Sequence, residues 1–158
     1  MKIAIASDHA GVRLKKQILE HLAARTGIEI EDFGTFEDTA VDYPDFARKV
    51  AGSVSSGVAE RGILVCGSGV GMSVAANKYP GVRAAVIDGI ETASQARAHV
   101  DTNVAVFGER QILPEDALPA LDVWLDTKFE GGRHKRRVDK IGEIEREIGG
   151  NHRNNSKS

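Results

Sequence analysis

Short apolar runs alternate along the chain with longer stretches in which apolar residues recur every three or four positions. Short continuous runs are typical of strands buried in a parallel sheet, whereas the longer spacing is typical of helices with one buried face. The pattern predicts strands at residues 2–6, 28–33, 63–65, 83–87 and 103–107. It predicts helices at residues 12–22, 44–54, 73–78, 92–99, 113–125 and 133–148.

Strands that alternate with helices indicate an α/β protein, a three-layer Rossmann-like sandwich in which helices cover both faces of a five-stranded parallel sheet. We expect the strand order 2-1-3-4-5, in which the first and third strands are neighbours where a crevice forms. The carboxyl ends of these two strands should then meet at one edge of the sheet. Residues 1–148 are expected to form one domain, and the polar residues 149–158 a frayed tail.

The third predicted strand ends in Cys66, and a glycine-rich loop follows it, Gly67-Ser68-Gly69-Val70-Gly71, before a helical pattern begins. Glycines allow a tight turn, and the start of a helix offers free N–H groups and a positive dipole end, which together bind anions. A cysteine in such a field is favoured as the thiolate. The stretch therefore predicts a base or nucleophile beside donors for negative charge.

Two common nucleotide-binding loops do not fit this stretch. A Walker A loop needs lysine after its last glycine, where this chain has Met72 after Gly71. The dinucleotide fingerprint needs a glycine three places after Gly69, and that position is again Met72. From these residues alone, a tight turn around a buried structural cysteine is as good an interpretation as an anion site.

Composition argues against several classes of function. The net charge of −2 argues against non-specific binding to nucleic acid. One cysteine excludes a disulfide within the chain and is typical of a reducing compartment. No apolar run is long enough to span a membrane, and the first residues lead directly into a strand, so we expect a cytoplasmic protein. The histidines are scattered and Cys66 stands alone, so no metal site is expected.

The predicted last helix is highly charged. Arg133 and Arg137 are four residues apart and share one helical face, which suits a phosphate group but is also typical of a solvated surface. We expect the apolar stripe of this helix to pack outside its own domain, on a second copy of the chain. The stripe comprises Val138, Ile141, Ile144 and Ile148.

Six short motifs follow one another along the chain: Ser-Asp-His-Ala-Gly at 7–11, Asp-Tyr-Pro at 42–44, Cys-Gly-Ser-Gly-Val-Gly at 66–71, Ala-Ala-Asn-Lys at 75–78, Asp-Thr-Asn-Val at 101–104 and Glu-Gly-Gly-Arg-His at 130–134. With them the chain, from Lys2 to about Ile148, resembles the type B ribose-5-phosphate isomerases, the family that also holds the galactose-6-phosphate isomerase subunits. The resemblance implies an enzyme without metal or other cofactor, a homodimer or tetramer with its active site at the subunit interface. It also implies a phosphorylated sugar as substrate, and interconversion of ribose 5-phosphate and ribulose 5-phosphate in the pentose phosphate pathway.

The resemblance assigns catalytic roles as well. Cys66 matches the base that moves a proton between adjacent carbons through a cis-enediolate, and His99 matches the acid that opens the sugar ring. These residue types suit the reaction, because it needs a base of moderate strength and donors for an oxyanion. The Ser68 hydroxyl can donate to that oxyanion or orient the thiolate. Without the resemblance, His99 also fits a partner for the dipole at a helix end.

Substrate contacts carry over in the same way. The matching positions are Asp8 and His9 in the first loop, Tyr43 in the cleft, Gly67, Ser68, Gly69, Val70 and Gly71 around the reacting carbons, and Arg110, Arg133 and Arg137 at the phosphate. Taken alone, Asp8 also fits a helix cap and Arg110 a surface charge. Val100 departs from the family, because many relatives have an asparagine there that contacts the sugar. Another branch of the family uses a glutamate as base where this chain has Met72, so the chain belongs with the cysteine branch.

Two alternative functions stay open. An apolar side chain at position 100 cannot bond a sugar hydroxyl, so an isomerase of a six-carbon sugar phosphate, such as allose or galactose 6-phosphate, is the nearest alternative. A non-catalytic sugar-phosphate-binding protein with the same fold is the alternative from another class. The presence of both Cys66 and His99 speaks against it.

Overall fold

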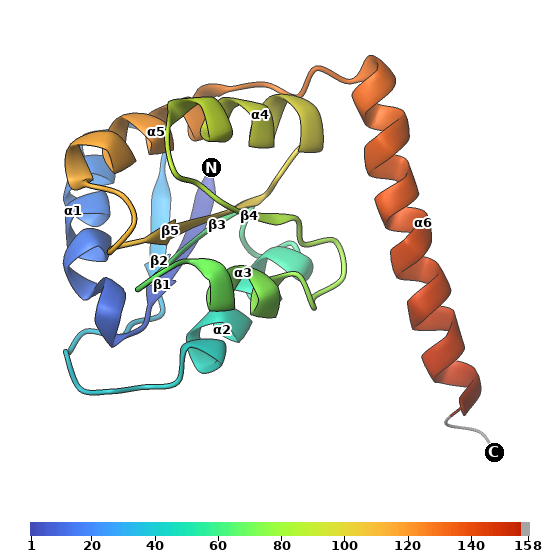
Figure 1. Ribbon diagram of the computed structural model, residues 1–158, viewed down its shortest axis with the longest axis horizontal. Coiled ribbons are helices and arrows are strands. Elements are labelled where there is room, and N and C mark those ends of the chain that lie inside the picture. The colour runs from blue at the N-terminus through green and yellow to red at the C-terminus, as the bar shows by residue number, and fades with distance from the viewer. Residues whose placement is uncertain (156–158) are drawn as a thin grey trace.

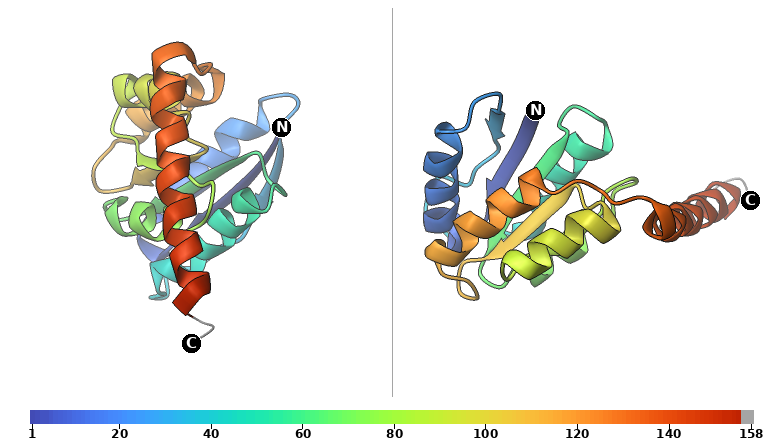
Figure 2. Two further views of the ribbon diagram at one scale, coloured as in Figure 1. Left: turned by 90° about the vertical axis from the view of Figure 1, so that its right-hand side faces the viewer. Right: turned by 90° about the horizontal axis from the view of Figure 1, so that it is seen from above.

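The computed structural model describes the backbone of residues 1–155 and the side chains of residues 1–149. As predicted, helices cover both faces of a parallel five-stranded sheet (Figure 1, Figure 2). The strands are β1 (Lys2–Ser7), β2 (Glu29–Asp32), β3 (Arg61–Cys66), β4 (Ala84–Val86) and β5 (Val104–Gly108). The helices are α1 (Val12–Ala23), α2 (Tyr43–Ser55), α3 (Val70–Ala76), α4 (Ile90–Val100), α5 (Pro114–Asp126) and α6 (Gly132–Asn155), with a short 3₁₀ turn, η1 (His9–Gly11), before α1.

The strand order is β2-β1-β3-β5-β4, so the predicted order 2-1-3-4-5 was wrong in its last two positions. Burial explains the difference. All residues of β5 are buried, which suits a strand with a neighbour on each side, whereas the three residues of β4 are only half-buried, which suits the edge. β1 and β3 are parallel neighbours, as predicted, and Ser7 pairs with Val65 near their carboxyl ends.

Alternate residues of each strand enter two separate cores, because successive side chains of a strand point to opposite faces of the sheet. Ile3 and Ile5 of β1 belong to the core that α1, α4 and α5 cover, and Ala4 and Ala6 belong to the core under α2 and α3. Helices packed on both faces hold the sheet, and therefore fix the strand ends that carry the predicted site.

Helix α6 stands apart from the sandwich (Figure 1, Figure 2). Gly131, just before the helix, and Gly132, its first residue, adopt left-handed φ values of 67° and 51°, so the chain turns where the helix begins. An apolar groove of about 750 Å³ lies between α6 and the body of the protein. Three isoleucines of the predicted stripe, Ile141, Ile144 and Ile148, line the groove and are exposed within the described part of one chain.

Helix α6 is longer than predicted and runs to Asn155 instead of Ile148. Residues 149–155, predicted as the start of a frayed tail, are helical, and residues 156–158 of that predicted tail lie outside the described residues. The end of the domain at residue 148 stays a prediction. None of the described helices is long and apolar enough to cross a membrane.

Candidate active site

Cys66 ends β3 at the edge where the carboxyl ends of the parallel strands meet. Its side chain is buried, and Sγ accepts a hydrogen bond from the Gly69 N–H at 3.1 Å. Gly69 has a φ of 80°, a conformation that favours glycine, and it turns the chain from the strand into α3. Helix α3 begins at Val70, three residues before the predicted start, so Gly71 belongs to the helix and not to the loop. The sulfur therefore lies against the backbone of the strand-to-helix turn.

Glycines let two polar side chains lie directly against this turn. A Cβ at Gly71 would come within 2.7 Å of the Tyr43 ring, and a Cβ at Gly67 within 3.3 Å of the Arg110 guanidinium. The backbone N–H of Arg110 also donates to the backbone oxygen of Gly67 at 3.0 Å, which ties the end of β5 to the turn. The structure thus brings Tyr43 and Arg110, two of the predicted substrate-binding residues, to the loop that follows Cys66.

Ser68 and Val70 lie on the outer side of the same turn, and both are exposed. Ser68 Oγ accepts a hydrogen bond from the Val70 N–H at 3.3 Å. The hydroxyl oxygen is the acceptor in this contact, so the hydroxyl hydrogen is left to donate to another group.

Asp8 and His9 follow β1 and lie beside the end of β3. The Asp8 N–H donates to Val65 O at 3.1 Å, and the Asp8 carboxylate accepts from the Ala10 N–H at 2.9 Å. Asp8 therefore caps η1 and stands at the candidate site as well. Burial raises the pKa of Asp8 above its ordinary value, and the hydrogen bond from Ala10 opposes this rise. His9 Nδ1 accepts from the Val41 N–H at 3.2 Å, which fixes the ring against the neighbouring loop.

A second group of polar side chains gathers where the end of α4 meets the start of α6. The rings of His99 and His134 stack, with centroids 4.3 Å apart and planes 5° apart. The Glu130 carboxylate lies 3.4 Å from His134 Nε2 and 3.9 Å from His99 Nε2. Arg133 Nε donates to His134 Nε2 at 3.3 Å, and Arg137 is exposed one turn further along α6. We refer to His99, Glu130, Arg133 and His134 as the histidine cluster, and to Asp8, His9, Tyr43, Cys66 and Arg110 as the thiol cluster.

The two stacked histidines differ in exposure. The side chain of His134 is 7% exposed and that of His99 is 40% exposed. Burial lowers the pKa of His134 below its ordinary value, and the nearby His99 and Arg133 act in the same direction. The lowered pKa favours the neutral ring, which agrees with a lone pair on the Nε2 atom that accepts from Arg133.

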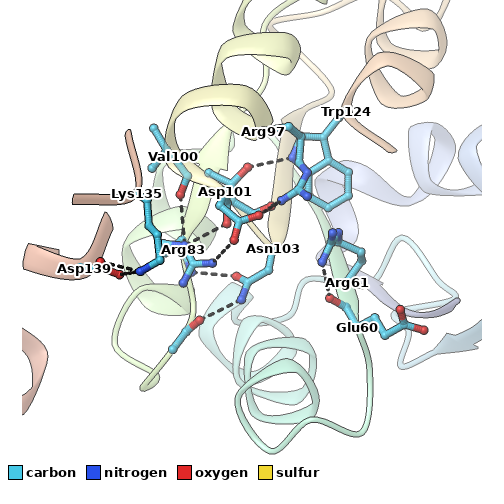
Figure 3. Close-up of polar contacts among 12 residues, drawn as sticks. Glu60, Arg61, Arg83, Arg97, Val100, Asp101, Asn103, Trp124, Lys135 and Asp139 are labelled. Atoms are coloured by element: carbon cyan, nitrogen blue, oxygen red, sulfur yellow. Dashed lines mark hydrogen bonds and ion pairs between the residues drawn. The ribbon is translucent and has the colours of Figure 1, made fainter. Parts of the chain in front are cut away.

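Arginine contacts fix the turn at the end of α4 (Figure 3). Arg97 Nη1 donates to Asp101 Oδ1 at 2.7 Å, and Arg83 Nη2 donates to Asp101 Oδ2 at 3.0 Å. These contacts hold Asp101 at a φ of 50°, which is uncommon for a residue other than glycine. The turn after His99 is therefore well defined, and it presents the apolar side chain of Val100 partly exposed to solvent.

The two clusters lie at opposite ends of the parallel strands, the thiol cluster at their carboxyl ends and the histidine cluster at their amino ends. Helix α4 leads into the amino end of β5, where Asn103 O accepts from the Gly62 N–H at 2.8 Å, whereas Cys66 pairs with Gly108 at the carboxyl end of β5. At about 3.3 Å per residue, the four steps from Gly62 to Cys66 span roughly 13 Å. One chain therefore does not bring Cys66 and His99 together, and the predicted phosphate-binding arginines are divided between the two ends of the sheet.

The sequence patterns predict no role for Glu130 or His134, although both lie in the motif at residues 130–134. The segment before α6 contains two adjacent glycines and no periodic apolar residues, and a carboxylate within such a segment has no pattern of its own. The spacing carried a usable signal, since residues four apart at the start of a helix face each other. Glu130 and His134 are four apart in the motif at residues 130–134.

Comparison with known proteins gives consistent matches over nearly the whole chain. A family model described as Ribose/Galactose Isomerase matches residues 3–141. The chain is 46% identical over 144 residues to Ribose-5-phosphate isomerase B of Escherichia coli (strain K12), an alignment that covers 91% of this chain and 96% of that protein. The structure of Clostridium thermocellum ribose-5-phosphate isomerase B matches with a TM-score of 0.91 at 51% identity, covering 94% of this chain and 99% of that chain. Ribose-5-phosphate isomerase B from Mycoplasma genitalium, solved with bound ribulose-5-phosphate, matches with a TM-score of 0.88 at 44% identity, covering 92% and 97%.

Proposed function

Because the chain belongs to the ribose/galactose isomerase family, we propose that it interconverts ribose 5-phosphate and ribulose 5-phosphate. Relatives named as ribose-5-phosphate isomerases match over most of its length, and one of them was solved with ribulose-5-phosphate. The observation that carries the proposal is the position of Cys66, whose sulfur lies 3.1 Å from a backbone donor at the carboxyl edge of the sheet. Tyr43 and Arg110 lie against the same turn.

In this proposal Cys66 is the base. Its thiolate removes the proton from C2 of the open-chain aldose, and the electron pair forms a cis-enediolate with negative charge on O1. The proton of the O2 hydroxyl then passes to O1, the thiol returns its proton to C1, and C2–O2 becomes the carbonyl of the ketose. The Ser68 hydroxyl and the N–H groups of the turn are the available donors for the oxyanion.

We assign ring opening to His99. The pentose phosphate is mostly a closed furanose, so the ring must open before C2 can lose its proton. His99 protonates the ring oxygen while the bond from C1 to that oxygen breaks, and the O1 hydroxyl loses its proton to solvent, which leaves the aldehyde at C1. The exposure of His99 supports this assignment, since 40% of its side chain is accessible to a substrate.

We also propose that a second copy of the chain completes the site. Cys66 and His99 lie at opposite edges of the sheet, so the thiol cluster of one subunit would face the histidine cluster of the other. The partner's Arg133 and the partner's Arg137 would then hold the phosphate together with Arg110, which fixes the reacting carbons beside Cys66. The groove beside α6, with its exposed isoleucines, gives the second copy an apolar surface to cover. The assembly is a homodimer, or a tetramer built from such dimers.

A panel of sugar phosphates tests the reaction. Purified protein is assayed with ribose 5-phosphate, allose 6-phosphate and galactose 6-phosphate, and we expect the highest kcat/KM with ribose 5-phosphate. Val100, next to His99, cannot bond a sugar hydroxyl, which keeps a six-carbon substrate as the alternative, and a higher kcat/KM with allose 6-phosphate would establish it. Tight binding of these compounds without turnover would instead indicate a non-catalytic sugar-phosphate-binding protein.

A further inference from the structure

Three side chains that can bind a metal ion converge within the histidine cluster. Nitrogen atoms of His99 and His134 and an oxygen of Glu130 all lie within 4.8 Å of one another. The three residues come from the end of α4, the link before α6 and the first turn of α6. All three belong to one chain, so this arrangement is complete without a partner subunit.

We propose that His99, Glu130 and His134 form an inhibitory binding site for Zn²⁺. Two imidazoles and one carboxylate are a ligand set that suits zinc and its neighbours among the transition metals, whereas Mg²⁺ and Ca²⁺ prefer oxygen ligands alone. Three protein ligands leave a fourth position for water. Binding removes the lone pair of His99, so the ion acts as an inhibitor and not as a cofactor.

The protonation of the cluster favours an incoming cation. His134 Nε2 accepts a hydrogen bond from Arg133 Nε, so this nitrogen holds a lone pair and the proton lies on Nδ1. The Glu130 carboxylate supplies the negative charge, and the charges that oppose the ion are those of Arg133 and Arg137 on α6. Both arginines are exposed and can turn toward solvent.

The geometry needs a modest adjustment. Zinc holds nitrogen and oxygen ligands at about 2.0–2.2 Å, which in a tetrahedral site places the donor atoms about 3.3–3.6 Å apart. The 3.4 Å separation between Glu130 and His134 already fits, and the 3.9 Å separation between Glu130 and His99 must shorten. The two rings stack, so their lone pairs lie in parallel planes and one ring must rotate for both to point at the ion. His99 is the ring that can do so, because it is the more exposed of the two.

Occupation of the site would compete with the sugar phosphate. Zinc takes the nitrogen with which His99 protonates the ring oxygen, and it displaces Arg133 from His134. This second part of the inference rests on the proposed function, whereas binding of the ion does not.

Direct binding is the first test. Zn²⁺ is titrated calorimetrically into the Cys66→Ala protein, which removes the thiol as a competing ligand, and Co²⁺ in the same protein should give the visible absorption of a tetrahedral site. Adding Glu130→Gln to this background should weaken Zn²⁺ binding by at least about 10-fold. Loss of even an outer partner of a metal ligand lowers metal affinity by about 10-fold or more, and Glu130 is a direct ligand in this proposal. His134→Gln should do the same. The matched control is His21→Gln, a partly exposed histidine paired with Asp122 on the far side of the protein, and it should not change the affinity.

Inhibition is the second test. Zn²⁺ should inhibit the protein with intact Cys66, and the inhibition should be competitive with ribose 5-phosphate. The rate of the Glu130→Gln variant is measured with and without Zn²⁺, and the two rates should be equal. Equal Zn²⁺ affinity with and without Glu130, or Mg²⁺ binding as tight as that of Zn²⁺, would overturn the site. Zinc binding without inhibition would overturn its inhibitory role. If the protein turns over no sugar phosphate but still binds Zn²⁺ through Glu130, the site stands and the proposed function fails.

Discussion

Cys66 is buried among apolar side chains, yet its sulfur also accepts a hydrogen bond from the backbone of a turn. A cysteine that only fills space in a core can be replaced by a small residue at a cost in stability and with its chemistry unaffected. A cysteine that transfers a proton cannot be replaced in this way. The two roles are therefore separable by comparing turnover with binding and folding.

Replacing Cys66 by alanine should lower kcat by roughly 100- to 10,000-fold, the range that a positioned acid or base contributes, with little change in ribulose 5-phosphate binding. The matched control is Met72→Leu, a change of similar volume at a fully buried residue of the same core, which should leave kcat near that of the parent. Near-normal turnover by Cys66→Ala would show that the base lies elsewhere.

Asp8 offers a test of the electrostatics at the strand end. Burial raises its pKa, so folding favours the protonated acid. This stabilisation is fully present below the ordinary pKa of 3.8 and is lost as the pH rises through the folded value. Asparagine imitates the neutral acid and keeps the oxygen that accepts from Ala10. Asp8→Asn should therefore raise Tm at neutral pH, and the gain should disappear below about pH 3.8.

Thermal unfolding across this pH range measures the effect, with the exposed Asp38→Asn as the control for loss of one negative charge. A lower Tm for Asp8→Asn than for the parent at neutral pH would contradict the argument from burial.

Most elements of the fold are predictable because their signals are local. An apolar run or a three-to-four spacing lies within one segment, and so do the glycines that separate segments. The exceptions have non-local causes. β5 lies between β3 and β4 because it is buried on both faces, and α3 begins early because Gly71 packs under the ring of Tyr43 from another helix. A glycine weakens a helix in isolation, so the sequence pattern assigns it to the loop.

Helix α6 carries the prediction that concerns the phosphate. Arg133 and Arg137 share one face, so removing one charge-assisted contact should weaken transition-state binding by roughly 1.5–3 kcal/mol. Arg137→Ala should therefore lower kcat/KM for ribose 5-phosphate by about 10- to 100-fold. Lysine should restore only part of this loss, because it lacks the planar fork of the guanidinium.

Two controls separate phosphate binding from general damage to the helix. Arg136→Ala removes a charge from the next position, which faces another direction, and should have little effect. Unphosphorylated ribose should react equally slowly with the parent and with Arg137→Ala. If Arg137→Ala uses ribose 5-phosphate as well as the parent does, the arginines form a solvated surface.

At the scale of the molecule, the sequence predicts which residues belong to the candidate site without predicting where in the fold each of them lies. Cys66, Asp8 and Arg110 follow parallel strands, so their shared edge can be derived from the strand pattern. His99 ends a helix that leads into a strand, which places it at the opposite edge, and no local pattern indicates that the two edges belong together. The apolar stripe on α6 is the feature of the sequence that indicates a second copy. Its isoleucines stay exposed in the described part of one chain, so a second chain is needed to cover them.

The shared site is the central claim, and subunit complementation tests it most directly. Chains with Cys66→Ala and chains with His99→Ala are given different affinity tags, expressed together and separated into the two homodimers and the hybrid. Each homodimer lacks one group in both of its sites, whereas the hybrid has one site with both groups intact and one site with neither. If the site is shared, the hybrid should recover about half of the parent's activity per dimer while both homodimers stay far below it. A purified hybrid that is no more active than the homodimers would contradict a site shared between subunits.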